Sequence, residues 1–325
     1  MENGSYRYDI LKIDGLRITR YSAYPVFVLL LLIYVFIMVS NLGIVMKIAT
    51  EKALHKPMYL LFCNLPVCDA LSASAVLPGL LKDILTESDR YISYVACVIQ
   101  AFGAHLSSTS SHTILMIMAF DRYVAICDPL RYNTIMTNRM VGMLSVIAWV
   151  PAIIMVIILL SLTIRLSHCT STISNPYCDN PSLFKLSCEN VLPNQIFGLL
   201  FSVLLLVMSV SCIGLTYIKI AYVCFKNQSS TMKSKAIKTC STHLIVYLIF
   251  LVCGCTILIL HRFTSHEELR NLASILYHVV PTSLNPVIYG LQTTEIRQGL
   301  KQILQTTEIR QGLKQIFQRR KVIPR

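Results

Sequence analysis

Asp69 is the only acidic residue in the apolar stretch 58–81. A carboxylate in the interior of a bilayer is costly, and by default it indicates a functional site. Asn41 and Asn285 occupy two other apolar stretches and could share a buried polar network with it. The alternative is a polar contact that only fastens helices to one another, which is common in membrane bundles. In both interpretations Asp69 contacts neighbouring helices.

A set of polar side chains in residues 95–126 could form part of a binding site. At 100° per residue, these side chains share one face of a helix. They are His105, Ser108, Thr109 and His112. Ligand pockets are mostly apolar with a few placed polar groups, so such a stripe could line one. Some of the four could instead be packing residues, because Ser and Thr often hydrogen-bond their own helix.

Arg262 lies just beyond the apolar stretch 236–260. A guanidinium can pair bidentately with a carboxylate, so Arg262 is a candidate contact for an acidic ligand. It could instead anchor the helix end by snorkelling, or pair with Glu267 or Glu268. The sequence leaves these roles open.

The composition argues against a water-soluble enzyme. Of the 325 residues 54% are hydrophobic and 14% are charged, whereas soluble domains contain about 25% charged residues. The net charge of +13 would suit nucleic-acid binding only if it lay on one exposed face. Seven stretches long enough to cross a bilayer, which takes about 20 apolar residues, exclude that function. We expect spans at 24–48, 58–81, 95–126, 140–162, 195–223, 236–260 and 272–291, of which the third and seventh are the most polar.

Charge bias orients these spans with the N-terminus outside. The inner side then carries 19 Lys and Arg with five acidic residues, whereas the outer segments carry ten of each. Positive charge collects on the cytoplasmic side of membrane proteins. Asn3 agrees, because it begins a glycosylation sequon in the outer tail. Four cysteines lie in or beside outer segments, and sequence alone allows three pairings of Cys97, Cys169, Cys178 and Cys188.

Five motifs stand in the order that one family shows. They are KPMY at 56–59, MAFDRYVAIC at 118–127, three cysteines in the second outer loop, KAIKTCSTH at 235–243 and PTSLNPVIY at 281–289. Together they resemble the olfactory receptors, a branch of the class A G-protein-coupled receptors. The resemblance covers about residues 24–300. His261-Arg262-Phe263 is similar to the fish-like class I branch of that family.

The resemblance implies an all-α membrane protein, a seven-transmembrane helix bundle with a short amphipathic eighth helix on the membrane lipid. The expected regions are an extracellular tail (1–23), the receptor domain (24–291) and a cytoplasmic tail (292–325). That tail contains a tandem duplication, since residues 292–303 recur 13 residues later at 305–316. Thirteen residues turn a helix by about 220° beyond whole turns, so one straight helix cannot lay both copies on the membrane.

By resemblance, the inner end of the third span is a switch. Arg122 would leave Asp121 on activation and face a helix of the G protein. Without the resemblance, this pair is an interfacial salt bridge, worth about 0–1 kcal/mol when exposed. The residues assigned to coupling are Asp121, Arg122, Tyr123, Pro129, Leu130 and Tyr289.

The resemblance also implies a sodium ion at Asp69, held with Asn41, Ser111 and Asn285. Many olfactory receptors have a glutamate where this chain has Ser111, so a site with a single acid is expected. No other cofactor is expected.

The outer cysteines should pair, again by resemblance, as Cys97–Cys178 and Cys169–Cys188. The first disulfide would tie the outer end of the third span to the second outer loop. That loop would then form a lid over the ligand cavity.

One departure from the family lies in the sixth span. Olfactory receptors often carry Phe-Tyr in its middle, where this chain has Phe250-Leu251. The phenol of that aromatic toggle is therefore absent, so the family's toggle mechanism and pocket floor do not carry over to this chain directly.

The function implied is that of an odorant receptor, not an enzyme, in the plasma membrane of olfactory sensory cilia. It would bind a small ligand, such as a carboxylic acid or another water-soluble odorant, and activate a stimulatory olfactory-type G protein that raises cAMP. One alternative is a non-olfactory class A receptor for a peptide or lipid. Another is a channel or transporter, which would often show inverted repeats that this sequence lacks.

Overall fold

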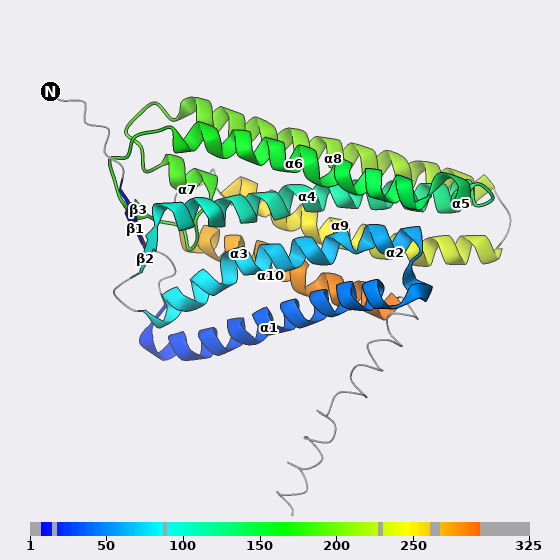
Figure 1. Cartoon of the computed structure of the whole chain (residues 1–325), viewed down its shortest axis with the longest axis horizontal. Coiled ribbons are helices and arrows are strands. Elements are labelled where there is room, and N and C mark those ends of the chain that lie inside the picture. Colours follow the sequence, from blue (N-terminus) through cyan, green and yellow to red (C-terminus); the bar gives the residue numbers. More distant parts are fainter. Residues whose placement is uncertain (1–7, 15–17, 87–89, 227–229, 261–266, 293–325) are drawn as a thin grey trace, which may run out of the picture.

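The computed structural model describes residues 8–14, 18–86, 90–226, 230–260 and 267–292, with side chains left out at 20, 230–239, 291 and 292. Long helices lie side by side in one bundle (Figure 1). Each predicted span corresponds to one helical segment: α1 (Arg20–Thr50), α2 (Pro57–Phe62) with α3 (Asn64–Leu85), α4 (Tyr94–Cys127), α6 (Asn138–Ile164), α8 (Leu192–Lys226), α9 (Ser230–Leu260) and α10 (Glu267–Gln292). The predicted helical membrane bundle is confirmed. The short helices are η1 (Lys52–Leu54), α5 (Tyr132–Ile135) and α7 (Asn180–Phe184).

Hydropathy separates the lipid-facing helices from the inner ones. Five segments of the described chain are long and apolar enough to cross a membrane, and α4 and α10 are not among them. This agrees with the prediction that the third and seventh spans are the most polar. In α8 only 11% of the most apolar window is buried, against 61% in the second span. Since backbone polar groups are satisfied within a helix, α8 can present this apolar surface to lipid.

The second span is interrupted at Cys63, between α2 and α3. Pro66 has no backbone N–H to donate to the Phe62 carbonyl, so the regular hydrogen-bond pattern stops there. Cys63 itself keeps helical torsion angles, with φ −56° and ψ −25°. The two helices therefore run on as one span from Pro57 to Leu85.

One end of the bundle is covered by a small sheet that the sequence did not predict. Strand β1 (Ile10–Ile13) pairs antiparallel with β2 (Tyr91–Ser93) and parallel with β3 (Thr172–Ile173). Its side chains alternate, so Leu11 is fully buried while Ile10 is 61% exposed. We call this the outer end, because the two disulfides described below lie there and disulfides persist in oxidising compartments.

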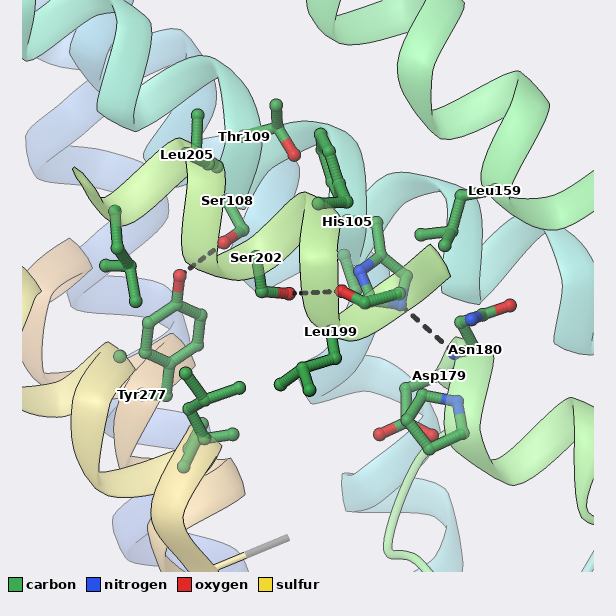
Figure 2. Close-up of a pocket in the computed structure, with 18 of the residues that line it drawn as sticks. His105, Ser108, Thr109, Leu159, Asp179, Asn180, Leu199, Ser202, Leu205 and Tyr277 are labelled. Carbon is green, nitrogen blue, oxygen red and sulfur yellow. Dashed lines mark hydrogen bonds between the residues drawn. The ribbon is translucent and has the colours of Figure 1, made fainter. Parts of the chain in front are cut away.

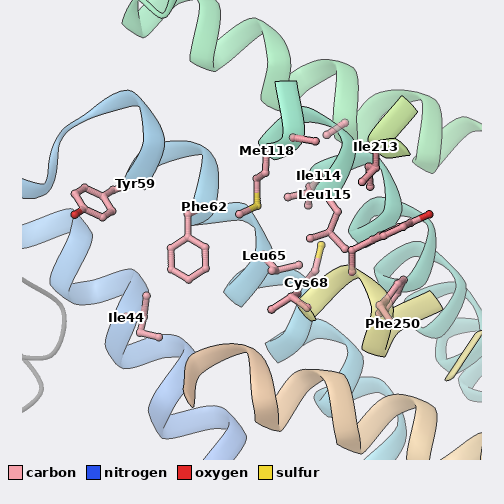
Figure 3. Close-up of a cluster of buried hydrophobic side chains, with 14 of the residues drawn as sticks. Ile44, Tyr59, Phe62, Leu65, Cys68, Ile114, Leu115, Met118, Ile213 and Phe250 are labelled. Carbon is pink, nitrogen blue, oxygen red and sulfur yellow. The ribbon is translucent and has the colours of Figure 1, made fainter. Parts of the chain in front are cut away.

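The largest apolar cluster lies between the helices in the inner half of the bundle (Figure 3). It takes residues from six of the seven spans and from η1, among them Ile44, Phe62, Leu65, Leu115, Ile213 and Phe250. Leu115 on α4 is fully buried at its centre. The cluster holds α4 in the middle of the bundle, where its polar face meets the site described next.

Several predicted features fall outside the described residues. They are the amphipathic eighth helix, the tandem duplication of the tail, the glycosylation sequon at Asn3 and the candidate ligand contact Arg262.

Candidate functional site

A cavity of about 450 Å³ lies among α4, α6, α8, α9 and α10 below the outer segment 177–185. Its volume is within the range of about 300–1,000 Å³ that is typical of ligand pockets. Much of the wall is apolar, with side chains that include Leu159, Phe184, Leu199, Leu205, Ile257 and Leu258. The structure places all four predicted polar residues of α4 on this wall, namely His105, Ser108, Thr109 and His112. Figure 2 shows the first three of them.

His105 joins the outer part of the cavity to the segment above it. Its Nε2 atom accepts a hydrogen bond of 3.0 Å from the backbone N–H of Asn180. The Asn180 side chain in turn accepts from Thr163 at 2.7 Å, and Asn194 donates to Thr163 at 3.1 Å. Four parts of the fold, α4, α7, α6 and α8, are therefore linked by buried hydrogen bonds. The sequence pointed only to His105.

Ser108 and Tyr277 close the cavity on the α10 side, where their hydroxyl groups hydrogen-bond each other. The ring of Tyr277 packs against Phe250 of α9, with 5.5 Å between centroids. Phe250 in turn meets the edge of His112 at 4.8 Å. The phenol that is absent from α9 is thus supplied by α10. Tyr277 and His112 line the cavity floor, and Phe250 packs against both rings.

Tyr177 and His278 connect the outer loop to α10 and α3. His278 Nε2 lies 3.2 Å from the Tyr177 hydroxyl, and its Nδ1 lies 2.8 Å from Ser72 Oγ. Burial, and then the nearby Asp179 and Tyr277, raise the pKa of Tyr177 well above its usual value. The Tyr177 phenol therefore stays protonated and uncharged at physiological pH.

The structure contains both disulfides that the resemblance implies, Cys97–Cys178 and Cys169–Cys188. Gln100 reinforces the first, because its side chain accepts from the Cys178 N–H at 2.8 Å and donates to the Ala75 carbonyl at 3.0 Å. Cys178 lies between Tyr177 and Asn180, so this disulfide holds both over the cavity. The sequence signal for these two residues was their proximity to Cys178.

Asp69 and Asn285 form the centre of the buried polar network. The Asn285 side-chain amide donates to both carboxylate oxygens of Asp69, at 2.9 and 3.2 Å. Asp69 is 3% exposed, so this bidentate contact compensates a carboxylate far from water. The sequence placed these two residues in one network, and the structure joins them directly.

Asn41 and Ser111 make their hydrogen bonds to other residues around that pair. Asn41 donates to the Thr282 carbonyl of α10 at 3.1 Å, while its side-chain oxygen is buried without a partner in the described residues. Ser111 hydrogen-bonds the Cys68 thiol instead. Hard cations take oxygen ligands, so the Asp69 carboxylate and the free oxygen of Asn41 fit a sodium ion with one acidic ligand.

At the inner end of α4, Arg122 and Asp121 form an ion pair of 3.2 Å. Tyr132 of α5 donates to the other carboxylate oxygen of Asp121 at 2.8 Å. Asp121 is only 2% exposed, so the pair is more than a solvated surface contact. Asp121 therefore joins Arg122 of α4 to Tyr132 of the second inner loop.

The other residues assigned to coupling lie at the same end. Tyr289 packs on Phe62 at 4.4 Å, and its hydroxyl is buried without a hydrogen bond in the described residues. Lys219 of α8 lies 5.9 Å from the ring centre of Tyr123. Pro129 is exposed, and Leu130 is 95% exposed. An apolar side chain left in solvent at this end is available to a partner protein.

The comparisons with known proteins all identify the same family. A family model described as "Olfactory receptor" matches residues 30–307. Olfactory receptor 52P1 of Homo sapiens is 36% identical over 268 residues, 82% of this chain and 83% of that protein. Olfactory receptor 51E2 of Homo sapiens is 35% identical over 271 residues, 82% of this chain and 84% of that protein. The chain therefore belongs to the olfactory receptor family, and it is a G-protein-coupled receptor and not an enzyme.

Proposed function

We propose that this receptor binds a small odorant in the cavity between α4 and α10 and activates a stimulatory olfactory-type G protein that raises cAMP. It would do so in the plasma membrane, in the cilia of olfactory sensory neurons, and as a member of the class I branch. The observation that carries the proposal is the cavity itself. Its volume of about 450 Å³ and its cover of outer loop suit a small molecule better than a peptide.

The inner end supports coupling to a G protein. The Asp121–Arg122 pair and the Tyr132 hydroxyl form a latch that must open before Arg122 can face a partner helix. A ligand that binds the open form more tightly would shift this equilibrium toward it.

Acidic odorants are the ligand class to test first. Arg262 could pair with a carboxylate, and Lys185 of the outer segment lines the cavity. Lys185 would hold the charged group of a ligand near the mouth, where it stays close to water. A sodium ion at Asp69 is part of the same proposal, and its test is given in the Discussion.

The test is cAMP production in cells that express the chain with a stimulatory G protein, exposed to short carboxylic acids and amino acids. We expect a response that Arg122→Ala abolishes and that Arg262→Ala shifts to higher concentrations. Surface expression of each variant is the control. Silence of a receptor that reaches the surface would contradict the proposal, and a ligand-dependent current without G protein would favour a channel.

A further inference from the structure

Three histidines line the described part of the cavity, and His112 differs from the other two. His105 accepts from the Asn180 backbone, and His278 uses both ring nitrogens, with Tyr177 and Ser72. The structure gives the His112 ring no hydrogen bond within the described residues, and its Nδ1 atom is buried. The side chain is nonetheless 4% exposed and lies on the cavity wall.

His112 also lies deeper than the other polar residues of α4. It follows His105 by two helical turns, which is about 10 Å along the axis. Its ring meets the edge of Phe250 at 4.8 Å with an interplanar angle of 68°, so it is held in place at the floor. The imidazole is therefore held in one position and has a nitrogen atom that makes no hydrogen bond in the described residues. A ligand that hydrogen-bonds this ring is favoured over one that does not, because a buried polar group without a partner costs free energy.

Charge in the described cavity wall is confined to its mouth. Lys185 is the one Lys or Arg among the lining residues, Asp179 the one acid, and both belong to the outer segment. Asp179 already accepts from Asn175 and Ser182. A carboxylate carried down to His112 would have no cation beside it, and burying an unpaired charge is costly.

We propose that His112 forms a subsite for an uncharged oxygen group of the odorant, a hydroxyl or a carbonyl. The ring nitrogen that faces the ligand can be a donor or an acceptor, depending on the tautomer of the neutral imidazole, so it can form one hydrogen bond with a hydroxyl or a carbonyl. The odorant enters with its oxygen group toward the floor, and its apolar chain lies along the Leu199 and Leu205 wall. This inference rests on the proposed function, because it names the chemistry of the same cavity.

Three probes of equal size differ in their polar group: n-heptanol has a hydroxyl, hexanoate has a carboxylate and n-octane has none. The purified full-length receptor is heated with each probe, and the ligand-induced rise in Tm reports binding, because a ligand that binds only the folded state stabilises it. We expect heptanol to raise the Tm of the wild type more than octane. A site that hydrogen-bonds a hydroxyl discriminates against an analogue that lacks it.

His112→Phe keeps a ring against Phe250 but removes both nitrogen atoms. We expect it to weaken apparent heptanol affinity about fivefold to tenfold, the effect of losing one hydrogen bond, and to leave octane unchanged. His112→Gln, which retains a donor and an acceptor, should recover part of the preference. Ser110→Ala is the matched control, since Ser110 Oγ is also buried without a partner on α4 but does not line the cavity.

Equal heptanol affinity in the wild type and His112→Phe would overturn the proposal, as would a wild type that heptanol does not stabilise. A drop in heptanol affinity of the same size in Ser110→Ala would also contradict it. The cAMP assay distinguishes this inference from the proposed function. If heptanol binding depends on His112 but no cAMP is produced, the subsite is supported and the proposed signalling is contradicted. If heptanol raises cAMP equally in His112→Phe, the signalling is supported and the subsite is contradicted.

Discussion

Ser108 on α4 and Tyr277 on α10 hydrogen-bond each other at the cavity floor. Tyr277 also packs on Phe250, the neighbour of Leu251, which stands where the family often has tyrosine. At this floor the polar contact to Ser108 of α4 therefore comes from α10, and α9 contributes the ring of Phe250. Movement of α10 relative to α4 would stretch or break this contact.

A double-mutant cycle should measure that contact. Ser108→Ala, Tyr277→Phe and the double variant should show a coupling free energy of about 0.6 kcal/mol, the average for hydrogen bonds between membrane helices. Because the two hydroxyls share one bond, the double variant should lose little more stability than either single variant. Unfolding of the purified receptor is the measurement, and strictly additive losses would show that the hydroxyls do not interact.

Strand β1 should stabilise the outer end through one side chain. Leu11 is fully buried in the cluster that contains Cys97 and Cys178. Leu11→Ala should lower the free energy of unfolding by about 2–5 kcal/mol, as for other buried leucines. Ile10→Ala, on the exposed face of the same strand, should change it by no more than about 0.5 kcal/mol. Thermal unfolding compares the pair, and equal effects would mean that β1 does not pack as described.

Sodium should raise the Tm of the receptor if the ion binds at Asp69. Asp69→Asn keeps the size of the side chain and removes its charge, so the dependence of Tm on sodium should disappear. Asp83→Asn is the control, because Asp83 is a second buried acid on α3. A wild-type Tm that is the same in sodium and in choline chloride would contradict the proposed ion.

Tyr132→Phe should raise basal signalling. The substitution removes the hydrogen bond from Tyr132 to Asp121 and leaves the ion pair with Arg122. Hydrogen bonds to charged groups contribute about 1.5–3 kcal/mol, so the resting equilibrium should shift toward the open form by about tenfold to a hundredfold. Ligand-free cAMP at matched surface expression is the readout. Basal cAMP at or below the wild-type level would show that this bond does not hold the latch closed.

The helical architecture could be predicted from the sequence because it depends on the hydropathy of long continuous segments. Apolar stretches long enough to cross a bilayer predicted seven spans, and each corresponds to a helix. The polar face of α4 was also predictable, since a fixed turn of 100° per residue places His105 and His112 on one side. Helical periodicity predicts which residues share a face of the helix, but it does not predict their partners on other helices.

The rest of the site depends on contacts between segments far apart in the sequence. Nothing in the local sequence of Asn180 or Tyr277 indicates that they hydrogen-bond His105 and Ser108. Strand β1 was missed for the same reason, because four residues make a strand only when β2 and β3 lie beside them. Asn41 was placed in the correct region, yet its partner is the Thr282 carbonyl and not Asp69. Sequence patterns do not specify backbone acceptors.

The position of β1 between β2 and β3 also sets an order of assembly. Ribosomal synthesis completes β1 first, but the edges that it joins exist only after Ile173 has been made. Until then Leu11 has no apolar contact from the second outer loop, so its side chain cannot reach the burial that it has in the finished fold. Closure of the sheet is therefore a late maturation step, and a defect in any of its three strands should appear as retention in the endoplasmic reticulum before it appears as altered odorant response.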